Sequence, residues 1–130
     1  MKRYRCLSVK QPFASMIASG QKKIETRKWR TSYRGDIVIV ASLDQRDVLP
    51  ISRRSEFPYG KAICVVKLIG IRPMSKGDER EACCELYDGA FAWMLTNVRR
   101  ILPIKVKGDL GLYWRDLRLI PQAAERLLRP

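Results

Sequence analysis

The chain lacks histidine entirely, and its four cysteines include no Cys-x-x-Cys pair. Histidine is the commonest general base and a member of the Ser-His-Asp triad, so any catalysis would have to use Lys, Tyr, Ser, Thr or a carboxylate. Structural zinc sites are usually built from Cys-x-x-Cys or from mixed Cys and His ligands. We therefore expect neither a metal site nor a cofactor.

Long apolar runs are also missing. The chain shows no signal peptide and no stretch long enough to cross a bilayer, so we expect no membrane association and a cytoplasmic protein with reduced thiols. A membrane-surface role would require an amphipathic basic helix, whereas the cations here lie mostly in strand-like or loop-like sequence.

Acidic residues are scarce in the first part of the chain. Lys and Arg number 26 against 13 Asp and Glu, and residues 1–35 carry ten cations and one acid, a net of +9. Such a face favours a polyanion, because each phosphate neutralised releases condensed counterions. RNA, another nucleic acid, or a nucleoside or nucleotide is the expected partner.

At 130 residues the chain is predicted to be a single domain, residues 1–130, with one core. Apolar periodicity predicts strands at 6–9, 23–30, 36–42, 61–72 and 98–106, and helices at 12–19, 78–87 and 121–128. The acidic 78–87 segment is expected to be a solvated helix on the far side. Residues 45–59 are expected to form an exposed loop that can carry one helical turn, and 108–111 a tight turn. Without regular strand–helix–strand alternation, this pattern predicts an α+β fold around a small, mixed, mainly antiparallel barrel.

Residues 20–30 are rich in side chains that could form a polar site. They include five cations, a single carboxylate and Trp29. If this stretch is a strand, Glu25 and Arg27 share one face about 7 Å apart, with Lys22 at the preceding turn. The alternative is an ordinary solvated carboxylate beside basic neighbours, since exposed ion pairs of that kind contribute little.

The spacing Gly20-x-Lys22-x-x-Glu25-x-Arg27, preceded by Leu7-Ser8-Val9-Lys10-Gln11-Pro12-Phe13-Ala14, resembles the ASCH domain family. The resemblance extends through residues 36–42 to 108–113. ASCH domains are small relatives of the PUA RNA-binding fold, so the resemblance implies a PUA-like β-barrel with short helices across one end. It also implies a cleft lined by Lys22, Glu25 and Arg27, which Lys10, Gln11 and Ser42 could share.

Three functions remain open. The first is nucleic-acid, especially RNA, or nucleotide binding through a basic cleft, with Trp29, Tyr33 or Tyr113 stacking an unpaired base. The candidate binding residues are Lys10, Gln11, Lys22, Lys23, Glu25, Arg27, Lys28, Trp29, Arg30 and Ser42. The second is a small hydrolase: some ASCH relatives resemble amidohydrolases of acylated cytidine, and Lys22 matches their lysine, although Glu25 stands where they have a threonine. The third is a ribonuclease using Lys22 and Glu25 as acid and base.

Overall fold

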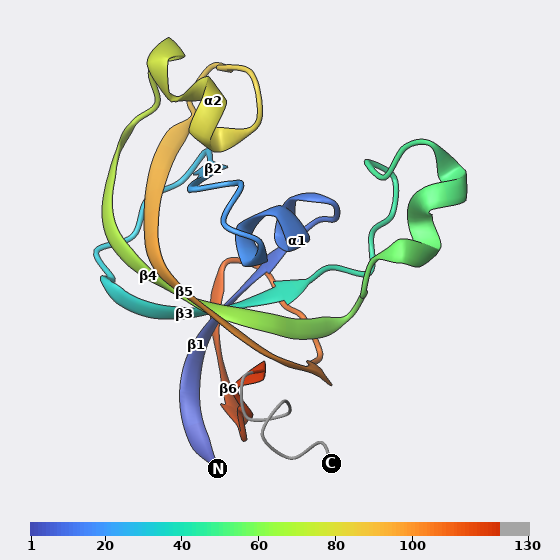
Figure 1. Ribbon diagram of the computed structural model, residues 1–130. Helices are drawn as coiled ribbons and strands as arrows, with labels where there is room; N and C mark the ends of the chain where they lie inside the picture. The colour runs from blue at the N-terminus through green and yellow to red at the C-terminus, as the bar shows by residue number, and fades with distance from the viewer. Residues whose placement is uncertain (123–130) are drawn as a thin grey trace.

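A computed structural model of the chain describes residues 1–122 (Figure 1). The strands are β1 (Lys2–Val9), β2 (Ile24–Arg27), β3 (Gly35–Ala41), β4 (Lys61–Pro73), β5 (Phe91–Lys105) and β6 (Leu112–Leu117). The helices are α1 (Phe13–Ala18) and α2 (Glu79–Ala82), with 3-10 turns η1 (Ile51–Glu56) and η2 (Lys76–Asp78). Among residues 1–122 no helix has the length and apolarity that a membrane crossing requires.

The six strands form one sheet in the order β2-β5-β4-β3-β1-β6. Only β1 and β3 run parallel, so the predicted α+β fold with a mainly antiparallel sheet is confirmed. Three register shifts along the β4–β5 pair bend these long strands, which curve across the molecule in Figure 1. The sheet stays open rather than closing into a full barrel. The segment after β6 reaches back to β5 through one bridge, Ile101 to Pro121.

Both faces of the sheet carry a core. On one face Leu7, Val9, Ile37 and Ile39 pack with α1, which lies inside the curve of the sheet (Figure 1). On the opposite face, a second core includes Cys6, Val38, Val40 and Tyr113. Because β3 contributes to both cores, residues 37–41 are all buried, as the β-branched run at 36–42 predicts. This face alternation also fixes which β1 side chains lie on the α1 side.

Two parts of the sequence prediction were wrong. Residues 112–117 form a strand that was not predicted, and the acidic segment, although largely solvated as expected, does not lie on the far side. Its helix is only the four residues of α2, and it packs against β2. The helix predicted at 121–128 lies outside the described residues, apart from Pro121 and Gln122.

Candidate ligand-binding cavity

The turn after α1 places Lys22. Gly20 takes a positive φ of 85°, which glycine adopts without a Cβ penalty, and the Lys22 N–H then donates to the Met16 carbonyl at 3.0 Å. This folds the Lys22 side chain inward, where the residue is only 3% exposed. Its Nζ donates to the Ala82 carbonyl and lies 3.6 Å from Glu25 Oε1. The glycine turn therefore leads the Lys22 side chain into the interior of the protein.

Strand β2 positions the carboxylate. Pairing with β5 sets Glu25 opposite Trp93, and the two-residue period puts Glu25 and Arg27 on one face. Glu25 Oε2 accepts from Arg27 Nη2 at 2.8 Å and from Nε at 3.2 Å, while Oε1 accepts the Thr26 N–H at 3.0 Å. Arg27 Nη2 also donates to the Ser8 carbonyl at 2.7 Å. The Lys22–Glu25–Arg27 network therefore joins the α1 turn, β2 and β1, with two cations around one carboxylate.

The α2 segment covers the outer side of β2. The Lys23 N–H donates to the Glu81 carbonyl at 2.8 Å, and Thr26 Oγ1 lies 3.7 Å from Cys84 Sγ. Since β2 is an edge strand, its outer backbone groups would otherwise face solvent. This is the physical reason that the acidic segment lies beside the basic stretch. The backbone of α2 provides acceptors, including the one for Lys22.

A cavity of about 310 Å³ opens against this network. Its lining residues are Val9, Lys10, Phe13, Lys22, Glu25, Thr26, Asp47, Cys84 and Tyr87. At the rim, Lys10 Nζ lies 3.5 Å from Asp44 and 3.9 Å from Asp47. Hydrogen bonds from Arg46 hold the pKa of the Asp44 carboxyl below its usual range, so this carboxylate stays ionised at neutral pH.

The structure brings three predicted residues, Lys10, Lys22 and Glu25, to the cavity wall, and Arg27 reaches it through Glu25. Gln11 is fully buried elsewhere: its Nε2 donates to Ser15 Oγ at 2.8 Å and to the Pro58 carbonyl at 2.9 Å. These hydrogen bonds of Gln11 connect the segment just before β4 to helix α1. Ser42 lines a separate, larger apolar cavity of about 730 Å³.

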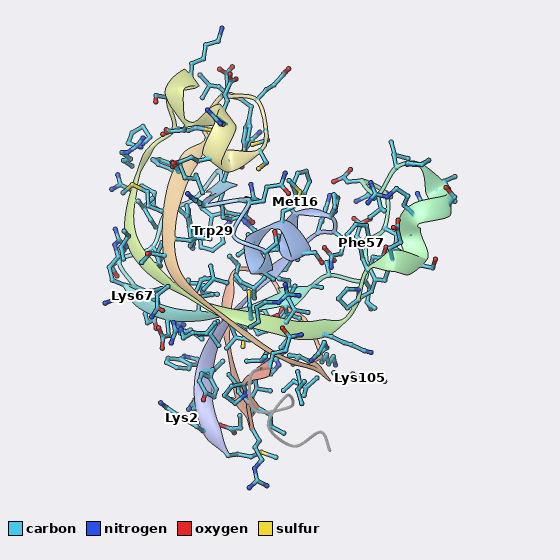
Figure 2. All side chains as sticks on the ribbon, viewed as in Figure 1. Lys2, Met16, Trp29, Phe57, Lys67 and Lys105 are labelled. Carbon is cyan, nitrogen blue, oxygen red and sulfur yellow. The ribbon has the colours of Figure 1, made fainter. Side chains whose placement is uncertain are left out.

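The other predicted residues lie around the cavity rather than in it. Lys23, Lys28 and Arg30 are exposed, and the Arg30 guanidinium lies 5.2 Å from the Phe91 ring centroid. Trp29 packs edge-on against Trp93, with 4.8 Å between ring centroids. Figure 2 shows Trp29 beside the α1 region. Trp93 itself is a core residue, since it is 0% exposed.

Two predicted stacking residues are committed to other contacts. Tyr113 is buried and its hydroxyl lies 2.7 Å from Ser8 Oγ, and burial raises the pKa of this phenol. The Tyr33 hydroxyl donates to the Asp36 carbonyl at 2.6 Å. Sequence reasoning missed the lining residues Val9, Phe13, Thr26, Asp47, Cys84 and Tyr87. The last three lie far along the chain from the motif, so no local spacing could have assigned them.

The described residues contain no group of three or more Cys, Asp or Glu side chains that could hold a metal ion. The chemistry of the cavity wall is instead that of a buried ammonium and an ion-paired carboxylate beside a threonine and two aromatic rings. Such a wall offers a ligand both hydrogen-bond donors and apolar contact.

Comparison with known proteins identifies the family. The ASCH domain profile matches residues 7–105. The chain is 49% identical over 141 aligned residues to human activating signal cointegrator 1 and 23% identical to the mouse protein of the same name, in each case over 95% of this chain. It spans about a quarter of these relatives, 24% of their length.

Solved structures share the fold. The crystal structure of an ASCH protein from Zymomonas mobilis matches with a TM-score of 0.61 at 20% identity, covering 87% of each chain. A variant of that protein matches with a TM-score of 0.59 at 17% identity, covering 98% of this chain and 97% of the variant. Together with the profile match over most of its length, these findings show that the chain belongs to the ASCH domain family.

Proposed function

We propose that this ASCH domain binds RNA, taking one unpaired nucleotide into the cavity at the Lys22–Glu25–Arg27 network while the surrounding cations contact phosphates. The observation that carries this proposal is Lys22. Its ammonium is held almost out of solvent at a cavity wall, beside a carboxylate already bound to Arg27. Burying the Lys22 ammonium and the Glu25 carboxylate is costly, and stability alone is a weak reason to retain such a pair.

The cavity has the size and chemistry for one nucleoside. About 310 Å³ lies at the lower end of ligand pockets, which run from roughly 300 to 1,000 Å³. Unpaired RNA bases are recognised by stacking on aromatic side chains and by hydrogen bonds along their edges. Phe13 and Tyr87 supply rings, and Lys22, Glu25 and Thr26 supply polar groups of both kinds. A base fits this combination better than a purely apolar ligand does.

The surface around the cavity suits a phosphate backbone. Lys23, Lys28 and Arg30 are exposed on the same stretch of chain, and residues 1–35 carry a net charge of +9. Contacts of exposed cations to phosphates supply sequence-independent affinity through counterion release. We therefore assign specificity to the cavity and most of the affinity to the basic surface.

Hydrolysis is the second candidate, because the Lys22 ammonium lies 3.6 Å from a carboxylate oxygen at a cavity wall. Both Glu25 oxygens already accept hydrogen bonds, which favours a positioning role over that of a free base. Lys22→Arg separates the two functions: a binding site keeps most of its affinity because the charge remains, whereas a catalytic lysine loses turnover. Acylated cytidine and labelled RNA are the substrates to test.

The binding proposal is tested by filling the cavity without touching the network. Cys84 lines the cavity and Leu86, two residues on, is exposed and does not. Cys84→Phe should abolish binding of nucleoside monophosphates measured by NMR titration, while Leu86→Phe should leave it unchanged. Equal binding by both variants would contradict the proposal.

A second readout uses the wild-type protein. Cys83 and Cys84 are both partly exposed, and only Cys84 lines the cavity. A bound nucleotide should slow alkylation of Cys84 and leave that of Cys83 unaffected. Equal rates of Cys84 alkylation with and without nucleotide would count against occupation of the cavity.

A further inference from the structure

Strands β1 and β6 carry a cluster of stacked arginines and aromatic rings outside the cavity. Trp114 is paired with Arg5 in the strand register, and Arg3 is the next residue on the same face of β1. The guanidinium carbons of Arg3 and Arg5 lie 4.9 Å and 4.6 Å from the Trp114 ring centroid. Arg5 also lies 5.1 Å from the Tyr33 ring centroid. We call these four residues the arginine–aromatic ladder.

The described contacts of the Arg3 and Arg5 guanidinium groups are with aromatic rings rather than with hydrogen-bond acceptors. Within residues 1–122, neither guanidinium has a hydrogen-bond acceptor or an ion-pair partner, and Arg5 Nε is buried without one. Asp116 faces Arg3 in the register, yet the two make no ion pair. By contrast, Arg27 and Arg99 each bind a carboxylate. Stacking occupies the flat face of a guanidinium and leaves its N–H edge for an acceptor, an arrangement suited to phosphate.

The ladder lies on the same side of the sheet as the cavity. Arg3, Arg5, Leu7 and Val9 alternate onto one face of β1, and Val9 lines the cavity. Val9 is four residues beyond Arg5 along β1, about 13 Å at the rise of a strand. In Figure 1, β1 runs from the N-terminus up to the α1 region, with β6 alongside its lower part. Arg27 of the cavity network donates to the carbonyl of Ser8, a β1 residue that lies between Arg5 and Val9 in the sequence.

We propose that the arginine–aromatic ladder is a second binding surface, on which a single-stranded nucleic acid continues after one of its nucleotides has entered the cavity. That the nucleic acid continues from the ladder into the cavity rests on the proposed function, whereas nucleic-acid binding at the ladder itself does not. Trp114 is 45% exposed, so the part of its ring that the guanidinium groups leave uncovered can contact a base, and the exposed Arg3 guanidinium can bind a phosphate. The alternation of rings with cations matches the alternation of bases with phosphates, which an acidic peptide lacks.

The test uses the full chain and an RNA of about 12 nucleotides, within the range that single-stranded binding folds cover. Arg3→Gln with Trp114→Ala removes one phosphate contact and the stacking ring. The matched control is Lys67→Gln with Leu110→Ala, which removes one charge and one exposed apolar side chain at positions outside the ladder. Affinities are measured by fluorescence anisotropy at about 50 mM salt, where phosphate contacts are strong. Thermal unfolding verifies that both double variants are folded.

The ladder variant should bind the RNA about 5- to 100-fold more weakly than the control variant, the loss typical of one stacked base. Single-stranded DNA of the same length should show a similar loss, and nucleoside monophosphate binding at the cavity should not change. The inference is overturned if both double variants bind RNA alike. It is also overturned if an acidic peptide shows the same loss as RNA, since the ladder would then recognise negative charge alone.

The two proposals fail separately. With Cys84→Phe blocking the cavity, the ladder still predicts residual RNA binding that Arg3→Gln with Trp114→Ala reduces further. If nucleoside monophosphates never bind but the ladder variant still loses RNA affinity, the cavity proposal fails and the ladder stands.

Discussion

Replacing Glu25 with Gln is the sharpest perturbation of the cavity wall. Glu25 is 6% exposed and is the carboxylate that neutralises both Lys22, whose side chain is 2% exposed, and Arg27. The amide keeps nearly the same shape and can still accept the Thr26 N–H through its oxygen. The substitution therefore removes the negative charge with little change in packing.

The expected loss of unfolding free energy is large because Lys22 stays buried without its carboxylate partner. Removing one partner of a buried ion pair costs roughly 3–5 kcal/mol, most of it the penalty of the uncompensated charge. The hydrogen bond that the amide retains places Glu25→Gln near the lower end, about 3 kcal/mol. For a domain of this size that corresponds to a fall in Tm of about 10 °C.

Urea unfolding measures this loss, and the chain supplies a matched control. Glu56 pairs with Arg53 at 2.7 Å on the surface, where both side chains are more than half exposed. Glu56→Gln should cost less than about 1 kcal/mol, as exposed pairs do. Adding Lys22→Met to Glu25→Gln should restore part of the stability by removing the stranded cation. A Glu25→Gln loss no larger than that of Glu56→Gln would refute the buried network.

Three further predictions concern salt, pH and thiols. RNA affinity should fall with salt with a log–log slope of about 0.7 per phosphate contacted, and joint replacement of Lys23, Lys28 and Arg30 by Gln should weaken all sequences alike; salt-independent affinity would contradict this. Hydrogen bonds from Arg72 lower the pKa of Asp78 below its usual 3.8, so this carboxylate stabilises the fold above that pH and the benefit is lost as pH falls through the folded-state pKa. The unfolding free energies of wild type and Asp78→Asn should thus differ at neutral pH and converge in acid. Burial raises the pKa of Cys6 to about 11 and of Cys64 to about 12, so alkylation of the native protein at neutral pH, followed by peptide mass spectrometry, should modify Cys83 and Cys84 first.

Local patterns predicted the elements that do not depend on distant partners. Residues 37–41, in the run predicted as a strand at 36–42, form a strand buried on both faces, and the apolar segment before Gly20 is a helix. Two-residue periodicity also predicts that Glu25 and Arg27 share one face, which is their arrangement in β2. These features follow from side-chain period and backbone freedom, both of which can be read in a short window.

Features that depend on tertiary packing were missed. In 112–117 the buried residues Tyr113 and Leu117 are four apart, and the charged Arg115 and Asp116 between them hide the strand. The acidic segment was placed away from the basic stretch because its charge has the opposite sign. The deciding contacts are made to backbone carbonyls about sixty residues away: the Lys23 N–H donates to Glu81, and the Lys22 ammonium donates to Ala82. No composition or spacing encodes such a contact.

The central claim is that the cavity beside Lys22 takes a single nucleotide. A crystal of the protein soaked with nucleoside monophosphates tests this most directly. The account predicts a base inside the cavity, in contact with Tyr87 or Phe13, with a polar atom within hydrogen-bond distance of Lys22, Glu25 or Thr26. A nucleotide bound only through its phosphate on the outer surface, or lodged in the apolar cavity beside Ser42, would contradict it.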